Sequence, residues 1–132
     1  MKPFYYESSD YAPRVDFNSL TGIFELEGIS RPENVSAFYI DLIGWLKEYE
    51  QTCCKSGKAA ETGIVLNIKL TYCNSASSKY ILQAIEIIIS WKKYGILPQV
   101  NWYYDESDEK MKEDGQDLSD ALDYGFNFIS LA

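Results

Sequence analysis

Apolar and polar residues alternate in two short runs near the N-terminus. Residues 14–18 and 23–27 each alternate, and residues 19–22 between them supply polar side chains and a glycine. A period of two predicts strands with one buried face, and the short glycine-containing connection predicts an antiparallel hairpin. Residues 1–12 are aromatic and polar without a clear period, which is consistent with an edge segment.

A helical period follows the hairpin. Apolar residues recur at helical spacing from Phe38, so we expect a first helix that ends near Gln51. Ser30 and Glu33 have the spacing of a capping box, which predicts that Ser30 caps this helix. The polar, glycine-containing stretch from Lys55 to Thr62 is predicted to be a mobile loop.

The second half of the chain alternates strand and helix patterns. Residues 64–70 are almost continuously apolar, which is typical of a central strand covered on both faces. A helical period over residues 80–94 follows, and residues 99–104 are the next strand candidate. A weak helical pattern through residues 118–122 and a short strand at residues 126–129 complete the chain. Strand–helix–strand order predicts parallel strands with crossover helices, hence a small α/β fold with an N-terminal hairpin and two to three helices.

Composition indicates one globular domain and narrows its partners. Hydrophobic residues make up 46% of the 132-residue chain, and we take residues 1–132 as a single domain. The net charge is −8, and residues 105–123 hold nine acids and two lysines. Since no basic patch is present, nucleic acid and anionic membranes are disfavoured as partners. No apolar run reaches the ~20 residues of a membrane span, and no signal peptide is seen, so we expect a cytoplasmic protein.

Few residues are suited to enzymatic chemistry. The chain has no histidine, and its three cysteines are Cys53, Cys54 and Cys73, so neither a zinc site nor a disulfide framework is expected. It also lacks a phosphate-binding loop and a Gly-x-Ser-x-Gly elbow. We therefore expect no catalytic residue, no metal and no cofactor.

An acidic cluster, Asp105, Glu106, Asp108 and Glu109, has two interpretations. It is either a solvated face or a surface that steers a complementary protein partner. A metal-dependent enzyme that uses Asp105, Asp108 or Glu109 is a further alternative, although the spacing is not that of an EF-hand.

The segment Asn74-Ser75-Ala76-Ser77-Ser78-Lys79 lies where the apolar strand meets the next helix. Ser and Asn are preferred helix caps, and helix N-termini favour anions. Three hydroxyls exceed what one cap uses, so the segment predicts a cap, a phosphorylation site, or both. A small α/β module that binds an anionic ligand there is the alternative. A Ser–Lys nucleophile is formally available, but adjacent residues at a helix start seldom point toward each other.

Three segments in collinear order resemble the SiaC family of bacterial regulatory phosphoproteins. They are Gly28-Ile29-Ser30-Arg31-Pro32-Glu33-Asn34 with Phe38-Tyr39, Tyr72-Cys73-Asn74-Ser75-Ala76-Ser77-Ser78-Lys79, and Trp102-Tyr103-Tyr104-Asp105-Glu106-Ser107-Asp108-Glu109-Lys110-Met111 with Glu113 and Gly115. The resemblance implies a STAS-like fold, akin to anti-sigma-factor antagonists. It also implies a switch set by a protein kinase and a PP2C-type phosphatase. In the best-understood systems of the family, the unmodified form binds and activates a diguanylate cyclase, which connects it to cyclic-di-GMP signalling and biofilm formation.

The resemblance also suggests which side chain is modified. Ser75 follows Asn74 as the phosphoserine of the antagonists follows an aspartate, so Ser75 is the first choice and Ser77 the second. Ser75 stands where the family often has threonine, and Ala76 removes a hydroxyl that the family often has. The surroundings of the site would be Asn74, Ser78 and Lys79.

Overall fold

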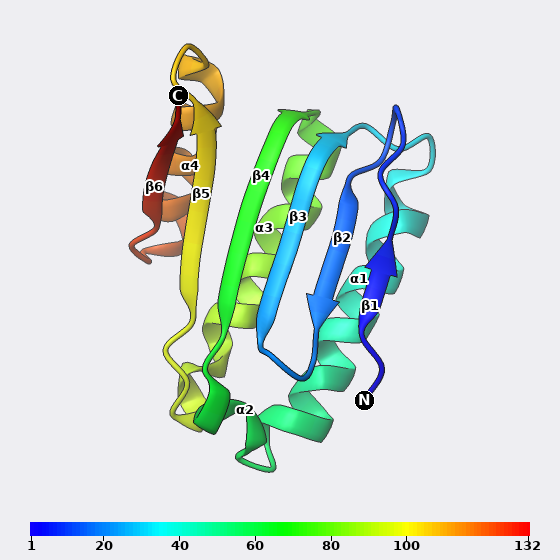
Figure 1. Cartoon of the computed structure of the whole chain (residues 1–132), viewed down its shortest axis with the longest axis vertical. Coiled ribbons are helices and arrows are strands. Elements are labelled where there is room, and N and C mark those ends of the chain that lie inside the picture. The colour runs from blue at the N-terminus through cyan, green and yellow to red at the C-terminus, as the bar shows by residue number, and fades with distance from the viewer.

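Six strands form one sheet in the order in which they occur along the chain. The computed structural model describes the backbone of residues 1–132 and all side chains except those of Ala60 and Thr62. Figure 1 shows the elements. The strands are β1 (Phe4–Tyr6), β2 (Arg14–Asn18), β3 (Ile23–Ser30), β4 (Val65–Cys73), β5 (Gln99–Asp105) and β6 (Asn127–Leu131), and the helices are α1 (Val35–Tyr49), α2 (Lys58–Thr62), α3 (Ser75–Ser90) and α4 (Glu109–Leu122).

The predicted hairpin is confirmed, and so is the edge segment before it. β1, β2 and β3 pair antiparallel. The turn is built by Asn18, whose Oδ1 accepts the N–H groups of Leu20 at 2.9 Å and Thr21 at 3.2 Å. Gly22 follows at φ 73°, where a Cβ would lie 2.2 Å from the Gly63 carbonyl oxygen, so only glycine fits this position.

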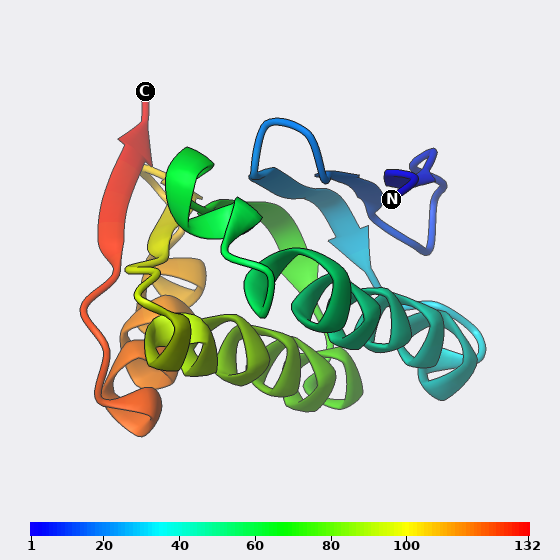
Figure 2. The same ribbon diagram turned by 90° about the horizontal axis from the view of Figure 1, so that it is seen from below.

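The predicted parallel crossovers are also confirmed. β3, β4, β5 and β6 are parallel neighbours joined in turn through α1, α3 and α4. Each connection is right-handed and advances one strand in the same direction, which places all three helices on the same face. Figure 2 shows this helical layer on one side of the sheet. None of the helices in the described chain is long and apolar enough to cross a membrane.

The expectation that the central strand is covered on both faces is wrong. In β4 the side chains of Leu66 and Ile68 are buried under the helices, whereas Asn67 and Lys69 are half-exposed on the other face. The run looked continuous because β-branched and other apolar residues surround these two polar positions. The sheet therefore has one covered face and one open face.

The first helix begins later than the sequence predicted. Asn34 caps α1, since its Oδ1 accepts the N–H of Ala37 at 3.1 Å. Ser30 is instead the fully buried last residue of β3, paired with Cys73 of β4. The capping-box prediction for Ser30 is wrong because pairing with β4 extends β3 through this residue.

Three further features of the helices differ from the predictions. A π-helical turn, Glu50–Cys54, extends α1, and the expected loop from Lys55 to Thr62 contains the short helix α2. Helix α3 begins at Ser75, not near Tyr80, because its first turn is polar and carries no apolar periodicity. A 3-10 turn, Trp91–Tyr94, extends its other end.

A cluster of aromatic rings in stacked, tilted and edge-to-face contact joins the hairpin to the helical layer. Phe24 lies 5.1 Å from Phe17 and 5.4 Å from Trp45, measured between ring centroids. Tyr49 lies 5.3 Å from Trp45 and 5.2 Å from Trp91. Aromatic pairs contribute about 0.5–1.5 kcal/mol beyond their buried area, so this cluster anchors α1 and the end of α3 to the sheet.

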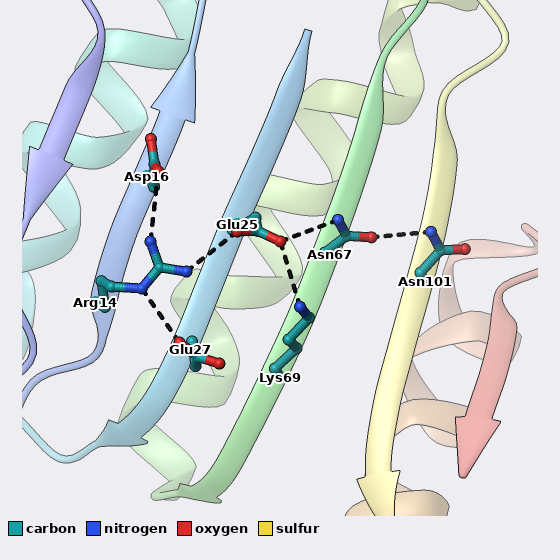
Figure 3. Close-up of polar contacts among 7 residues, drawn as sticks. All are labelled: Arg14, Asp16, Glu25, Glu27, Asn67, Lys69 and Asn101. Carbon is teal, nitrogen blue, oxygen red and sulfur yellow. Dashed lines mark hydrogen bonds and ion pairs between the residues drawn. The ribbon is translucent and has the colours of Figure 1, made fainter. Parts of the chain in front are cut away.

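A chain of side-chain hydrogen bonds crosses the open face (Figure 3). Asn101 donates to Asn67 at 2.9 Å, and Asn127 donates to Asn101 at 3.0 Å. We call these three residues the asparagine ladder. Asn67 in turn donates to Glu25 at 3.3 Å, and Arg14 donates to the other oxygen of that carboxylate at 3.1 Å. The chain therefore connects five neighbouring strands.

Helix α4 approaches β5 closely at Gly115. The indole of Trp102 donates to the carbonyl of Met111 at 2.9 Å, and a Cβ at residue 115 would lie 2.5 Å from the indole ring. We expect Gly115→Ala to destabilise the fold by about 1–3 kcal/mol through overpacking. Gly44→Ala is the matched control, since Gly44 lies in α1 with open space around it. This control should stabilise by about 0.5–1 kcal/mol, as measured by urea unfolding. Equal effects of the two variants would contradict this packing.

Glu25 makes the open face sensitive to acid. Burial raises the pKa of Glu25, but the hydrogen bond from Arg14 and the charge of Lys69 outweigh it, so the pKa lies below 4.5. A lowered pKa contributes stability that is present above the unfolded value and is lost as the pH falls through the folded value. We expect Glu25→Gln to be less stable than the parent near pH 7, with the difference shrinking as the pH falls below 4.5 and through the lowered pKa of Glu25. A difference in unfolding free energy that is constant with pH would contradict this.

Candidate functional site

Both polar segments singled out in the sequence lie at one edge of the sheet. β3, β4 and β5 are parallel, so their carboxyl ends meet at the same edge (Figure 1). α3 starts there directly after β4, and α4 starts shortly after β5. The backbone N–H of Asn74 donates to the Ser30 carbonyl at 3.1 Å, which fastens the start of α3 to β3. We call this region the carboxyl edge.

Asn74 caps helix α3. Its Oδ1 accepts the N–H of Ser77 at 2.8 Å, and its carbonyl accepts the N–H of Ser78 at 3.0 Å. The predicted cap is confirmed, and the asparagine provides it. The serine hydroxyls are therefore not needed as caps, and the N–H groups of Ser75 and Ala76 have no partner within the helix.

The three hydroxyls of this turn differ in exposure. Ser75 is exposed, and no hydrogen bond involves its side chain in the described part of the structure. Ser77 is fully buried, and its Oγ has no hydrogen-bond partner among the described residues. Ser78 is half-buried and donates to the Asn74 carbonyl at 3.3 Å. Lys79 is exposed. Of these three hydroxyls, that of Ser75 is the most exposed to another protein.

A buried pair of hydroxyls lies next to the first turn of α3. The hydroxyls of Ser30 and Tyr39 lie 2.5 Å apart, and the ring of Tyr39 stacks on that of Tyr80 with centroids 5.6 Å apart. Burial raises the pKa of Tyr39, which keeps its hydroxyl neutral. Sequence reasoning missed this pair, although Ser30 and Tyr39 both lie in the first segment that resembles the SiaC family.

The side chains of this turn are not arranged for nucleophilic catalysis. The Sγ of Cys73 lies 3.4 Å from the Ser78 Oγ, and burial raises the pKa of Cys73, so its thiol stays protonated. Ser78 is hydrogen-bonded to Asn74 and not to Lys79. Among the described residues, no hydrogen bond joins Lys79 to Ser75 or Ser78.

The side chains of two members of the acidic cluster, Asp105 and Asp108, accept local hydrogen bonds, and among the described residues those of the other two do not. Asp105 accepts the N–H and the hydroxyl of Ser107 at 2.9 and 2.6 Å, and these bonds lower the pKa of Asp105. Asp108 caps α4 by accepting the N–H of Met111 at 3.0 Å. Glu106 and Glu109 are exposed. In the described part of the chain, no group of three His, Cys, Asp or Glu residues could hold a metal ion.

A hollow between α3 and α4 links the serine turn to the acidic helix. It has a volume of about 290 Å³. Its lining consists of Cys73, Ser78, Ile81, Trp102, Asp114, Asp117, Leu118 and Ala121. A second hollow of about 170 Å³ lies between the end of β4 and the start of α4, where Lys110 and Asp114 form an ion pair at 2.9 Å. These two residues were not singled out in the sequence, although parallel pairing of β4 and β5 brings α4 to the carboxyl edge.

Comparison with known proteins agrees with the resemblance seen in the sequence. The family model described as SiaC family regulatory phosphoprotein matches residues 6–131. An uncharacterized protein of Pseudomonas aeruginosa is 19% identical over 114 residues, which are 86% of this chain and 85% of that protein.

Solved structures share the fold. The crystal structure of apo-SiaC from Pseudomonas aeruginosa matches with a TM-score of 0.75 and 19% identity over the full length of both chains. A crystal structure of the diguanylate cyclase SiaD in complex with its activator SiaC, from the same organism, also matches. There the TM-score is 0.80 at 19% identity, over 96% of this chain and 97% of that one. The expected small α/β fold is thereby confirmed.

Two substitutions distinguish the contribution of the Asn74 cap to stability from that of the buried Ser77 hydroxyl. We expect Asn74→Ala to destabilise the fold by about 1 kcal/mol, since it leaves the Ser77 N–H without its acceptor. Ser77→Ala should be neutral or stabilising, because it removes a buried polar atom that has no partner. Thermal unfolding of both variants checks this. A strong loss of stability in Ser77→Ala would show that its hydroxyl is bonded.

Proposed function

Because the chain belongs to the SiaC family of regulatory phosphoproteins, we propose that it is a non-enzymatic signalling switch phosphorylated on Ser75. A partner kinase adds the phosphoryl group, and a PP2C-type phosphatase removes it. The unmodified form binds a downstream protein in the cytoplasm. All of residues 1–132 act as one domain in this scheme.

We choose Ser75 over Ser77 as the phosphoacceptor because Ser75 is exposed. Its hydroxyl lies on the surface of the first turn of α3, whereas the Ser77 hydroxyl is fully buried. A kinase could reach Ser77 only by unwinding the turn that Asn74 caps. The free N–H groups at the start of α3 and the helix dipole favour a negative group at Ser75. Phosphorylation therefore needs no rearrangement of the fold.

A diguanylate cyclase is the effector that the relatives suggest. SiaC of Pseudomonas aeruginosa, which shares the fold, is the activator of the diguanylate cyclase SiaD. By analogy, the unmodified protein would stimulate synthesis of cyclic-di-GMP and thereby influence biofilm formation. The fold shared with SiaC, at 19% sequence identity, supports a diguanylate cyclase as the class of effector in this proposal.

The phosphoryl group would act by charge at the carboxyl edge. It adds about −1.5 to −2 charges one helical turn from the exposed cation Lys79, at an edge where Lys110 is already paired with Asp114. A carboxylate of the effector that docks against the α3 N-terminus would meet a like charge, which costs several kcal/mol in a contact. The neighbouring acids Asp105, Glu106, Asp108 and Glu109 would contact cations of the effector in the unmodified complex.

Mass spectrometry of protein incubated with its kinase tests the acceptor. We expect the parent, Ser77→Ala and Ser8→Ala to gain one phosphoryl group, and Ser75→Ala to gain none. Ser8 is the matched control because it is also an exposed serine. Undiminished phosphorylation of Ser75→Ala would eliminate Ser75 as the acceptor. Loss in Ser77→Ala alone would assign the site to Ser77.

A further inference from the structure

Strand β6 (Asn127–Leu131) is an edge of the sheet that lacks the usual protection against pairing. It carries no charge and no proline, and its Leu131 is 45% exposed. Edge strands are commonly blunted by charged residues, proline or short length. The opposite edge, β1, is only three residues long and follows Pro3. β6 is therefore the edge at which a further strand can pair.

One hydrogen bond shows which backbone groups of β6 point away from β5. The carbonyl of Leu131 accepts the N–H of Glu106 at 3.1 Å, so Leu131 faces β5 with both of its backbone groups. Successive residues of a strand face opposite sides of the ladder. Phe128 and Ser130 therefore present their N–H and C=O groups away from β5, toward solvent.

The hydrogen bonds of the asparagine ladder all run in one direction, so the ladder ends at β6 with an acceptor. The ionised Glu25 can only accept, so the amide nitrogen of Asn67 must point toward it. The Asn67 oxygen then accepts from Asn101, and the Asn101 oxygen accepts from Asn127. The Asn127 Oδ1 is the free end of this chain, and no donor reaches it from the described residues. Asn127 is exposed, so an incoming strand that carries a donor at this position would replace water there and extend the chain.

The neighbouring helix adds a charge preference. α4 covers the helical side of β5 and β6 in both ribbon views (Figures 1 and 2). It carries five acids and two lysines, and residues 105–123 as a whole have a net charge of −7. A cationic segment is attracted by this field, whereas an acidic one is repelled. Charge and the free acceptor of Asn127 both favour lysine or arginine in the partner.

A second copy of the chain fits this edge poorly. Antiparallel pairing of all five residues of β6 with those of another copy would place Leu131 of the second copy opposite Asn127. The Asn127 acceptor would then face an apolar side chain that offers it no donor. Such a dimer would also bring two acidic α4 helices to the same side of one continuous sheet, with like charges opposed.

We propose that β6 binds an extended, lysine- or arginine-bearing segment of another protein as a seventh strand of the sheet. The backbone of Phe128 and Ser130 pairs with the segment, and a cationic side chain of the segment donates to Asn127. Main-chain pairing of this kind provides affinity, and the side chains provide specificity. The surface is separate from Ser75 and does not rest on its phosphorylation.

Fluorescence anisotropy with two labelled, end-blocked octapeptides tests the proposal. One alternates lysine with valine and the other alternates glutamate with valine. We expect the lysine peptide to bind the parent and Ser130→Ala, and the glutamate peptide to bind neither. Ser130→Pro should bind the lysine peptide about tenfold or more weakly, because it removes only an outward N–H and proline is tolerated at such a position. Asn127→Leu should weaken binding by a similar factor, because it removes the acceptor for the lysine side chain. This variant introduces no proline into the strand.

Each other outcome overturns the proposal. Equal binding of the lysine peptide by Ser130→Pro and Ser130→Ala would show that only the charge of α4 attracts it. If the lysine peptide does not bind the parent protein even at millimolar protein concentration, β6 is not a binding site of this kind. A parent that sediments as a dimer, with Ser130→Pro as a monomer, would assign the edge to a second copy. If Ser130→Pro lowers the melting temperature, unchanged binding by Asn127→Leu decides against the proposal.

Discussion

The common direction of the three crossovers is the constraint on which the rest of the structure depends. Each right-handed connection advances the sheet by one strand, so α1, α3 and α4 cover one face and leave the other open. The same constraint brings the carboxyl ends of β3, β4 and β5 to one edge, where α3 and α4 begin. On the open face, half-exposed polar side chains bond to one another, as Glu25 and the asparagine ladder do.

At the carboxyl edge, the groups that hold the fold are distinct from the group proposed as the switch. Asn74 caps α3, and the hydroxyls of Ser30 and Tyr39 bond to each other beneath it. Ser75 projects from the same turn without any side-chain hydrogen bond in the described structure. A phosphoryl group on Ser75 would therefore change the charge of the surface without breaking a bond that the fold needs.

Local periodicity predicted most of the fold, because strands and helices have periods of two and 3.6 residues. It failed where the outcome depends on a distant segment. Ser30 and Asn34 can both cap a helix, and only pairing with β4 makes Ser30 a strand residue. Ser75 and Ser77 share one turn, and packing against α1 buries Ser77 alone. The open face was missed because only Asn67 and Lys69 interrupt the apolar run of β4.

The central claim is that phosphorylation of Ser75 changes binding to an effector while leaving the fold intact. The direct measurement compares unmodified protein with protein that carries phosphoserine at residue 75, by calorimetric titration of each into the diguanylate cyclase proposed as its effector. We expect at least about tenfold weaker binding of the phosphorylated form, together with similar melting temperatures of the two forms. Equal affinity of the two forms, or tighter binding of the phosphorylated one, would contradict it.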